Sequence, residues 1–256
     1  MYKKLEITFD YQTSKFHFGE GLFYPAQTEK RTLDDVRKTL MNPESDGPEV
    51  LYSIAMDVGK LKDKRDLENR HLLYGIVAYN HGLVGAEPVR SQGHIHSASE
   101  FADYSTPEVY EILEGRAIIY MQEFVSVNIG RCYAVYAKAG EIVIVPPGWA
   151  HFTVNADVTQ HMVFGAWCIR DYDFEYDEIR ARKGLAFYPV YNNEEIKWKK
   201  NKQYKEGHLK IVKPRTHHEF GLTKENIYLQ YENDPNKFDF VTNPKGYLKI
   251  WKNFEY

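Results

Sequence analysis

The chain has 256 residues, a formal net charge of −3 and 43% hydrophobic residues, which is enough for one large all-β domain with appendages or for two small domains. The charge gives no general attraction to nucleic acid or to anionic membranes, and two cysteines are too few for a disulfide framework. With no apolar N-terminal signal segment and no apolar run near the roughly 18 residues of a membrane span, we expect a cytoplasmic protein that binds neither membrane nor nucleic acid.

The first part of the chain predicts irregular structure and short strands, followed by one helix. In residues 32–42, TLDDVRKTLMN, the apolar side chains of Leu33, Val36 and Leu40 share a helical face, and Thr32 is a candidate N-cap. The stretch NPESDGP then predicts a turn.

From residue 50 to about residue 169 the sequence is a series of short apolar segments separated by Gly, Pro, Asn and Asp. The segments are VLYSIAMDV, HLLYGIVAYN, HIH, EVYEILE, RAIIYMQEF, CYAVYA, EIVIVP, HFTVNA and QHMVFGAWCI. This spacing is typical of a β-sandwich or barrel and not of alternating β/α units. The 20 Tyr and 14 Phe also favour sheets and an aromatic-lined cavity.

After the strands, residues 174–184 predict one helix that ends at Gly184. Residues 197–215 carry eight Lys or Arg against one Glu, which fits a patch for an acidic partner but more often marks a solvated linker. We expect the linker. Residues 216–256 return to an aromatic, strand-like pattern with NDPN and NPKG turns, and we expect an ordered C-terminal extension.

Two histidines lie one residue apart in the segment SQGHIHSASEFADYSTPEVYEILEG, residues 91–115. On a strand, His94 and His96 point to the same face, because successive side chains alternate. Two imidazoles on one face are half of a metal site, although two strand histidines without a ligand give the same pattern. The carboxylates that follow are Glu100, Glu108, Glu111 and Glu114.

A second motif lies in GEIVIVPPGWAHFTVN, residues 140–155. It reads as a turn at Gly140, a strand, a Pro-Gly reversal at 146–148, and a second strand that begins near His151. Both motifs together resemble the two motifs of the cupins. PEVYEILEG, VPPGWAHFTVN, KG at 183–184 and EEIKWKKNKQY are also similar to the cupin-type glucose-6-phosphate isomerases of archaea and some bacteria.

The resemblance covers roughly residues 30–204 and is strongest from 91 to 155. It implies an all-β fold, a cupin (jelly-roll) β-barrel with a few short helices. Residues 1–204 would then form the metal-dependent isomerase domain with an N-terminal arm. Residues 205–256 would be a C-terminal extension that packs on the barrel or on a dimer partner. The family also implies a homodimer.

Carried over to this sequence, the metal ligands are His94, His96, Glu108 and His151. Three imidazoles and one carboxylate suit a divalent transition metal, with Fe(II) expected first and Mn, Ni, Co or Zn as alternatives. Glu100, separated from His96 by three residues, is a rival ligand, because general cupin motifs use that distance. The Glu-x6-Gly spacing favours Glu108. Histidines satisfied within a core remain the alternative to a metal site.

The resemblance further implies substrate or phosphate contacts at Ser91, Gly93, Tyr110 and Tyr176, although core filling is an equal alternative for the two tyrosines. Val77 stands where the family leads us to expect Thr, and Trp167 where we expect Tyr.

The implied activity is the interconversion of glucose 6-phosphate and fructose 6-phosphate, with Glu108 and Tyr110 as catalytic residues. Another cupin metalloenzyme, such as a dioxygenase or decarboxylase, would use the same four ligands. A non-catalytic cupin that binds sugar phosphates would keep the barrel and the phosphate contacts.

Overall fold

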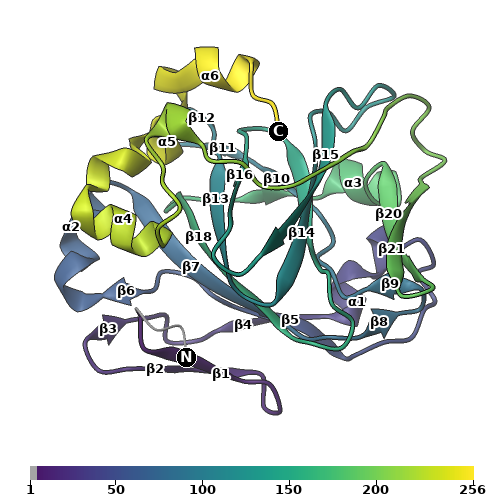
Figure 1. Cartoon of the computed structure of the whole chain (residues 1–256), viewed down its shortest axis with the longest axis horizontal. Coiled ribbons are helices and arrows are strands. Elements are labelled where there is room, and N and C mark those ends of the chain that lie inside the picture. Colours follow the sequence, from purple (N-terminus) through teal and green to yellow (C-terminus); the bar gives the residue numbers. More distant parts are fainter. Residues whose placement is uncertain (1–4) are drawn as a thin grey trace.

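The computed structural model describes residues 5–256, and its centre is a barrel made of two facing β-sheets (Figure 1). One sheet has six strands in the order β16-β13-β18-β7-β5-β4, and the other has four in the order β17-β14-β15-β22. The bounds in the six-stranded sheet are β4 Glu29–Thr32, β5 Val50–Ala55, β7 Leu72–Tyr79, β13 Glu108–Glu114, β16 Ile142–Val145 and β18 Met162–Ile169. Those in the four-stranded sheet are β14 Arg116–Gln122, β15 Cys132–Lys138, β17 Ala150–Asn155 and β22 Lys210–Val212. The expected all-β barrel is confirmed.

Short strands pair in twos around the barrel, and the helices are brief. The paired strands are β1 Ile7–Asp10, β2 Lys15–Phe18, β3 Leu22–Phe23, β6 Gly59–Lys60, β8 Leu83–Val84, β9 Glu87–Pro88, β10 Ile95–His96, β11 Ala98–Ser99, β12 Tyr104–Ser105, β19 Phe174–Glu175, β20 Phe187–Asn192 and β21 Glu195–Lys200. The α-helices are α1 Leu33–Val36, α2 Lys64–Asn69, α3 Asp177–Ala181, α4 Ile227–Asn233, α5 Asp239–Thr242 and α6 Leu248–Lys252. The 3₁₀ turns are η1 Arg37–Thr39, η2 Leu61–Asp63, η3 His218–Phe220, η4 Pro235–Phe238 and η5 Pro244–Tyr247. In the part of the chain from residue 5 onward, no helix has both the length and the apolar character that a membrane crossing needs.

Alternate side chains of the facing sheets fill the barrel. Val77 and Phe164 from the six-stranded sheet pack in one cluster with Ile119 and Met121 from the four-stranded sheet. The turn between β13 and β14 needs a glycine, because Gly115 has φ +76° and a Cβ there would lie 2.5 Å from the carbonyl oxygen of His161. This turn ends the strand that begins with Glu108 and therefore helps to fix its register.

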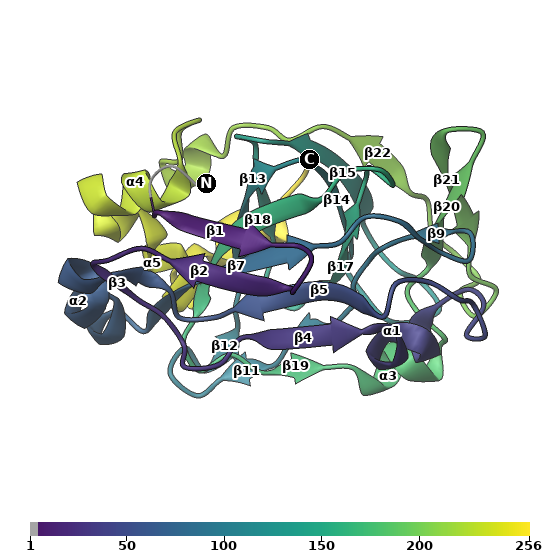
Figure 2. The same cartoon turned by 90° about the horizontal axis from the view of Figure 1, so that it is seen from below.

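The outer faces of both sheets are also covered. The helices α4 to α6, yellow-green to yellow in Figure 1, lie along the six-stranded sheet, where Trp167 contacts Tyr228, Tyr231 and Phe238. The hairpin β1–β2 runs across the same sheet near its β5 and β7 strands (Figure 2). Trp198 of the β20–β21 hairpin packs near Tyr120 on the other sheet. Strands β7 and β18 are consequently buried along their whole length.

The helix predicted over residues 32–42 exists, but it is split and shorter. Helix α1 spans Leu33–Val36 and η1 follows at Arg37–Thr39. Thr32 is the N-cap, as predicted, and it forms a capping box with Asp35. The predicted apolar face is buried.

The helix predicted over residues 174–184 begins too early. Phe174 and Glu175 form β19, which pairs with β10, and α3 covers only Asp177–Ala181. Gly184 lies beyond the helix end with φ +114°, as its predicted role as a stop signal requires. Pairing with β10 overrides the helical pattern at the start of this segment and brings Phe174 beside His96.

The strand-like pattern predicted over residues 216–256 is wrong, because this segment is helical. The predicted NDPN and NPKG turns are helix starts: Asp234 caps η4 just before Pro235, and Pro244 is the first residue of η5. Helix α4 begins at a further cap, where the Asn226 side chain accepts a hydrogen bond from the Leu229 N–H. Short apolar runs fit helix and strand equally well, and the capping residues carried the better signal.

The linker predicted over residues 197–215 is only partly correct. Residues 195–200 are the strand β21, and residues 210–212 form β22, which pairs in parallel with β15. Most of the basic side chains are nevertheless exposed, as a solvated segment requires.

Both cysteines, Cys132 and Cys168, are buried and free, which agrees with the absence of a disulfide framework.

Candidate metal centre

Two of the four predicted ligands face each other across a backbone bridge. The N–H of His94 donates to the carbonyl of His151 at 3.0 Å, and the N–H of His151 donates to the carbonyl of His94 at 3.0 Å. Residues paired in this way are direct neighbours, so their side chains leave the backbone side by side. Their ring centroids lie 4.3 Å apart.

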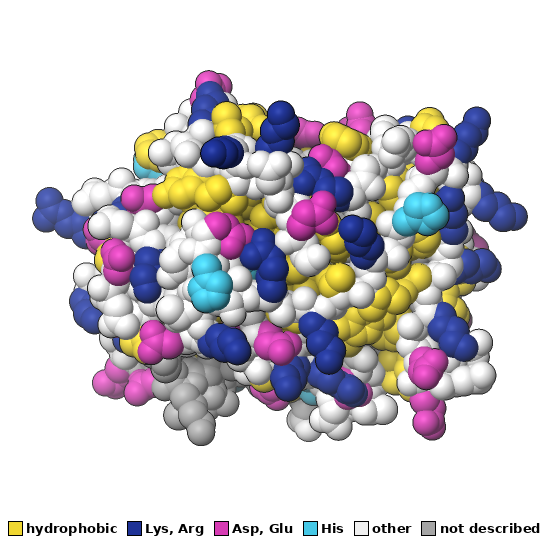
Figure 3. Space-filling view, turned by 45° about the horizontal axis from the view of Figure 1, so that its top comes forward, with side chains coloured by type: hydrophobic (Ala, Val, Ile, Leu, Met, Phe, Trp, Pro, Cys, Tyr) yellow, Lys and Arg dark blue, Asp and Glu magenta, His cyan; other side chains and the backbone are white. Residues whose placement is uncertain are grey.

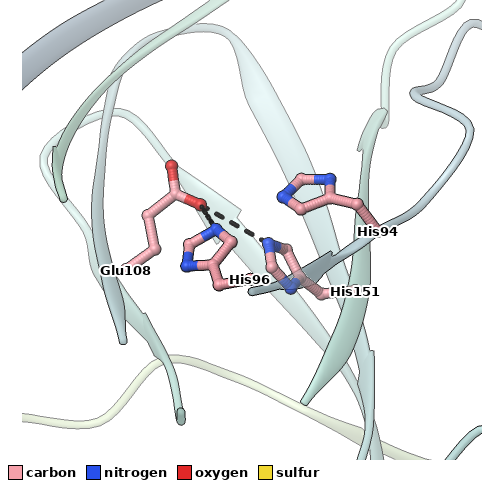
Figure 4. A group of neighbouring side chains, drawn as sticks. All are labelled: His94, His96, Glu108 and His151. Atoms are coloured by element: carbon pink, nitrogen blue, oxygen red, sulfur yellow. Dashed lines mark ion pairs between the residues drawn. The ribbon is translucent and has the colours of Figure 1, made fainter. Parts of the chain in front are cut away.

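The other two predicted ligands come from β10 and from the first residue of β13. The His96 Nε2 lies 3.3 Å from Glu108 Oε2, and the His151 Nε2 lies 3.4 Å from the same oxygen. Figure 4 shows this oxygen directed at both rings, with His94 on the far side of His151. The strand pairing Glu108–Val145 holds the carboxylate at this edge of the sheet.

The ligand atoms of His94, His96, Glu108 and His151 all lie within 4.8 Å of one another. The structure therefore brings together all four residues that the motifs single out. His96 and His151 are buried at 5% and 1% exposure, so these polar groups have left water. Such a cluster needs a partner for its polar atoms.

Burial and mutual contact set the charge of the cluster. Burial lowers the pKa of His94 well below its usual value, and the neighbouring imidazoles His151 and His96 lower it further. Burial also lowers the pKa of His151. For Glu108, burial raises the pKa, but the contacts from His151 and His96 outweigh burial and the pKa is lowered. Two imidazoles are therefore held neutral beside an ionised carboxylate, the protonation state that a metal ion requires.

The orientation of the rings supports a cation among them. The Nε2 atoms of His94, His96 and His151 are buried and have no hydrogen-bond partner. The Nδ1 atom of His96 faces the carbonyl of Thr106 at 3.0 Å, and that of His151 faces the carbonyl of Trp149 at 3.0 Å. A carbonyl at Nδ1 fixes the tautomer that leaves Nε2 free to coordinate a metal. The residues present thus fit a divalent metal ion.

The rival carboxylate lies elsewhere. Glu100 is exposed, in the turn of the β11–β12 hairpin that lies between His96 and Glu108 in the chain. Ser99 donates to Asp171 at 2.9 Å, and Lys245 of the C-terminal segment pairs with Asp103. These contacts hold the tip of the loop away from the cluster, and Glu100 is not part of it.

A cavity of about 160 Å³ opens beside the cluster. Among the predicted substrate contacts, Ser91, Tyr110 and Tyr176 line it, and Gly93 lies next to His94 in the chain. Tyr110 donates its hydroxyl hydrogen to Glu108 Oε2 at 2.6 Å, a link that the sequence does not predict. Burial and then the charge of Glu108 raise the pKa of Tyr110 well above 10, so it remains a donor.

The remaining predicted contacts differ in their placement. The Ser91 hydroxyl accepts a hydrogen bond from the Thr153 N–H at 3.0 Å, which fixes its position. Val77 lines the cavity, whereas Trp167 is buried against the C-terminal helices and donates from Nε1 to the carbonyl of Ile227 at 3.3 Å. Trp167 therefore belongs to the packing outside the barrel and not to the cavity.

The sequence does not predict several of the residues that line the cavity: Glu29, Arg31, Tyr52, Tyr79, Thr153 and Phe174. The tyrosines had a detectable signal, since Tyr52 and Tyr79 alternate with other apolar side chains in strand-like segments. Glu29 and Arg31 had none, because their four-residue strand β4 has no apolar pattern.

Comparison with known proteins agrees with this geometry. Residues 32–206 match the family described as Glucose-6-phosphate isomerase (GPI). Glucose-6-phosphate isomerase of Thermococcus litoralis is 26% identical over 197 residues, covering 75% of this chain and 95% of the relative. Glucose-6-phosphate isomerase of Pyrococcus abyssi is 32% identical over 124 residues, covering 48% of this chain and 60% of the relative.

The barrel and its cluster of three histidines and one glutamate define the chain as a cupin. With more than half of its length matched, the chain belongs to the cupin-type glucose-6-phosphate isomerase family, a family of isomerases. The matched part ends at residue 206, so helices α4 to α6 lie beyond it.

Proposed function

We propose that this protein is a metal-dependent aldose–ketose isomerase that interconverts glucose 6-phosphate and fructose 6-phosphate. The observation that carries the proposal is the convergence of His94, His96, Glu108 and His151, three of which line a cavity, in a chain of this family. The open-chain sugar would enter the cavity with its carbonyl end toward the cluster and its phosphate toward the mouth.

The four clustered side chains would hold one divalent transition metal, with Fe(II) first and Mn, Ni, Co or Zn as alternatives. When bound, such an ion supplies Lewis acidity that polarises a carbonyl oxygen. The imidazoles contribute neutral nitrogen donors and Glu108 contributes one negative charge, so the site keeps a net positive charge toward the substrate.

Glu108 would carry a proton between C1 and C2 of the substrate. Its carboxylate is ionised and lies at the wall of the cavity, while Tyr110 holds one carboxylate oxygen by a 2.6 Å hydrogen bond. That bond orients the base and also weakens it, because a donated hydrogen bond stabilises the carboxylate. A hydride shift between the same two carbons is the alternative chemistry.

Ser91, Gly93 and Tyr176 would contact the sugar or its phosphate. Gly93 has φ +92°, a backbone conformation that glycine adopts freely, and it directly precedes His94. Tyr176 lies at the start of α3, with the Arg180 guanidinium 4.7 Å from its ring centre. Ser91 and Tyr176 line the cavity beside the metal cluster, and Gly93 lies between Ser91 and His94 in the chain.

The experiment is an assay of the purified protein with glucose 6-phosphate, fructose 6-phosphate and the corresponding free sugars in deuterated water. The proposal expects isomerisation of the phosphorylated sugars, with deuterium at C1 or C2 of the product. Isomerisation without incorporation would favour the hydride shift. Absence of any isomerisation by the metal-loaded protein would contradict the proposed function.

We also propose where the protein is located, how many chains it contains and how each chain is divided. We expect a cytoplasmic homodimer in which residues 1–204 form the isomerase domain and residues 205–256 an extension that packs on it. Support for a dimer comes from the face in Figure 3, where apolar side chains gather in an area surrounded by charged ones. The edge strand β22 also carries Ile211 at 62% exposure. A monomer in sedimentation at micromolar concentration would contradict the dimer.

A further inference from the structure

Two oppositely charged residues of one edge strand face the cavity. In β4, Glu29 and Arg31 lie on the same face because strand side chains alternate, and both line the cavity. Lys30 points the other way and donates from Nζ to the carbonyl of Thr13 at 3.1 Å. Among the described residues that line the cavity, Arg31 is the one Lys or Arg.

A row of side chains leads from Arg31 into the cavity. Arg31 is paired in register with Tyr52, and Tyr52 is paired with Tyr79. The two tyrosine rings stack with centroids 4.6 Å apart and planes 8° from parallel. Tyr79 and Ser91 both line the cavity, as does His94 of the cluster. Arg31 therefore stands at the outer end of a polar wall that begins beside the metal cluster.

The guanidinium of Arg31 is held by a carboxylate that a substrate could displace. Arg31 Nη2 lies 2.6 Å from Glu29 Oε2, and the two side chains are 29% and 48% exposed. Partly exposed ion pairs of this kind contribute little net free energy. A phosphate group carries more charge than a carboxylate and matches the guanidinium fork equally well.

We propose that Arg31 binds the phosphate of the substrate, and that Glu29 competes with the phosphate for Arg31. The inference rests on the proposed function in so far as the anion is the phosphate end of an open-chain sugar. In the free protein Glu29 keeps the guanidinium paired and pointed along the cavity wall. When the substrate binds, the phosphate takes the place of the Glu29 carboxylate, and Glu29 turns to solvent.

The kinetic test compares three variants with the wild-type protein. Arg31→Gln removes the charge, and we expect KM for the sugar phosphate to rise roughly 10-fold or more with kcat nearly unchanged, as for a lost charged hydrogen bond. Glu29→Gln removes the competitor, and we expect KM to fall by about 2- to 5-fold, the range of an exposed ion pair. The matched control is Arg37→Gln, since Arg37 lies outside the cavity lining and pairs with Asp34 at 2.6 Å.

A binding measurement separates this inference from the proposed activity. Calorimetric titration with inorganic phosphate needs no turnover, and we expect the order of affinity Glu29→Gln, wild type, Arg31→Gln, from tightest to weakest. If the wild type isomerises no sugar phosphate but this order holds, the proposed function fails and the anion site stands. If isomerisation occurs while Arg31→Gln leaves KM and phosphate affinity unchanged, the inference is overturned. Weaker phosphate binding by Glu29→Gln would overturn the role of Glu29 as a competitor.

Discussion

Histidines are buried in the barrel and in the C-terminal segment, and the surroundings of the two sets differ. In the barrel, three Nε2 atoms meet around the carboxylate of Glu108. In the C-terminal segment, His217 is 1% exposed, stacks on Phe254 and meets the edge of Tyr256. Both ring nitrogens of His217 lack a hydrogen-bond partner, and the carboxylate of Glu219 lies 3.6 Å from Nδ1.

The comparison separates burial from the capacity to bind a metal. Burial lowers the pKa of His217 to about 4, as it lowers the pKa of His94 and His151. A neutral buried imidazole is thus common to both regions. Both regions also place a carboxylate beside the imidazole, but the barrel adds a second and third imidazole within 4.8 Å and backbone carbonyls that fix two of the rings. Convergence and orientation distinguish a metal site from a histidine in a core.

Matched replacements in the two regions should give the largest contrast. We expect His151→Ala to lose bound metal and to lower isomerase activity by roughly 10³-fold or more, because three ligands and a cavity hold the ion poorly. We expect His217→Phe to retain wild-type metal content and activity. Metal analysis and the isomerase assay check both variants, with circular dichroism as a control for folding. Equal losses of metal and activity in the two variants would contradict the distinction between the two buried regions.

The second prediction concerns Glu108, whose replacement by Gln keeps the size of the side chain but removes its negative charge. We expect Glu108→Gln to retain part of its metal and to lower kcat by roughly 10²-fold, as for loss of a general base. The metal content and kcat should be measured on the same preparation. A near-normal kcat with metal bound would leave Glu108 only as a ligand and would favour the hydride shift.

The pH dependence of stability should depend on the C-terminal histidine. The pKa of His217 is about 4 in the folded protein against an ordinary 6.5, so between these values the unfolded chain binds more protons. Stability should therefore fall as the pH is lowered through this window, by roughly 2 kcal/mol between pH 7.5 and pH 5. His94 and His151 add to the loss in both proteins, so urea unfolding at both pH values should show a loss in His217→Phe that is smaller than in the wild type by about the contribution of His217. The same slope in both proteins would contradict the assignment.

The smallest expected effect lies at the hydrogen bond from Tyr110 to Glu108. We expect Tyr110→Phe to lower kcat by roughly 10-fold, since one charge-assisted hydrogen bond is lost. The metal content should remain that of the wild type, because Tyr110 contributes no ligand. Loss of the metal together with activity would show that Tyr110 maintains the cluster and not only the orientation of Glu108.

The candidate site could be predicted because its residues lie in motifs with fixed spacing. Glu108 and His151 lie at the starts of β13 and β17, close after Pro107 and Gly148, while His94 and His96 flank the first residue of β10 just after Gly93. The barrel strands could be predicted in the same way, because short apolar segments are separated by turn residues in the sequence.

Other features depend on contacts distant in sequence. Arg31 reaches the cavity through the pairing of β4 with β5, and a four-residue polar strand gives no periodic signal of that pairing. The sequence predicts strands where α4 to α6 lie, because each of these helices is too short to show a helical period. They are stabilised by packing against Trp167 and by hydrogen bonds to Glu111, which accepts from the Asn226 side chain and the Ile227 N–H.

The central claim is that the histidine and glutamate cluster holds a catalytic metal ion. The most direct test measures metal content and isomerase activity together, on one preparation of the wild type, before chelation, after chelation and after addition of Fe(II) or Mn(II). We predict about one ion per chain at first, loss of ion and activity together, and recovery of both on addition of metal. Full isomerase activity in a sample verified to be free of metal would contradict the claim.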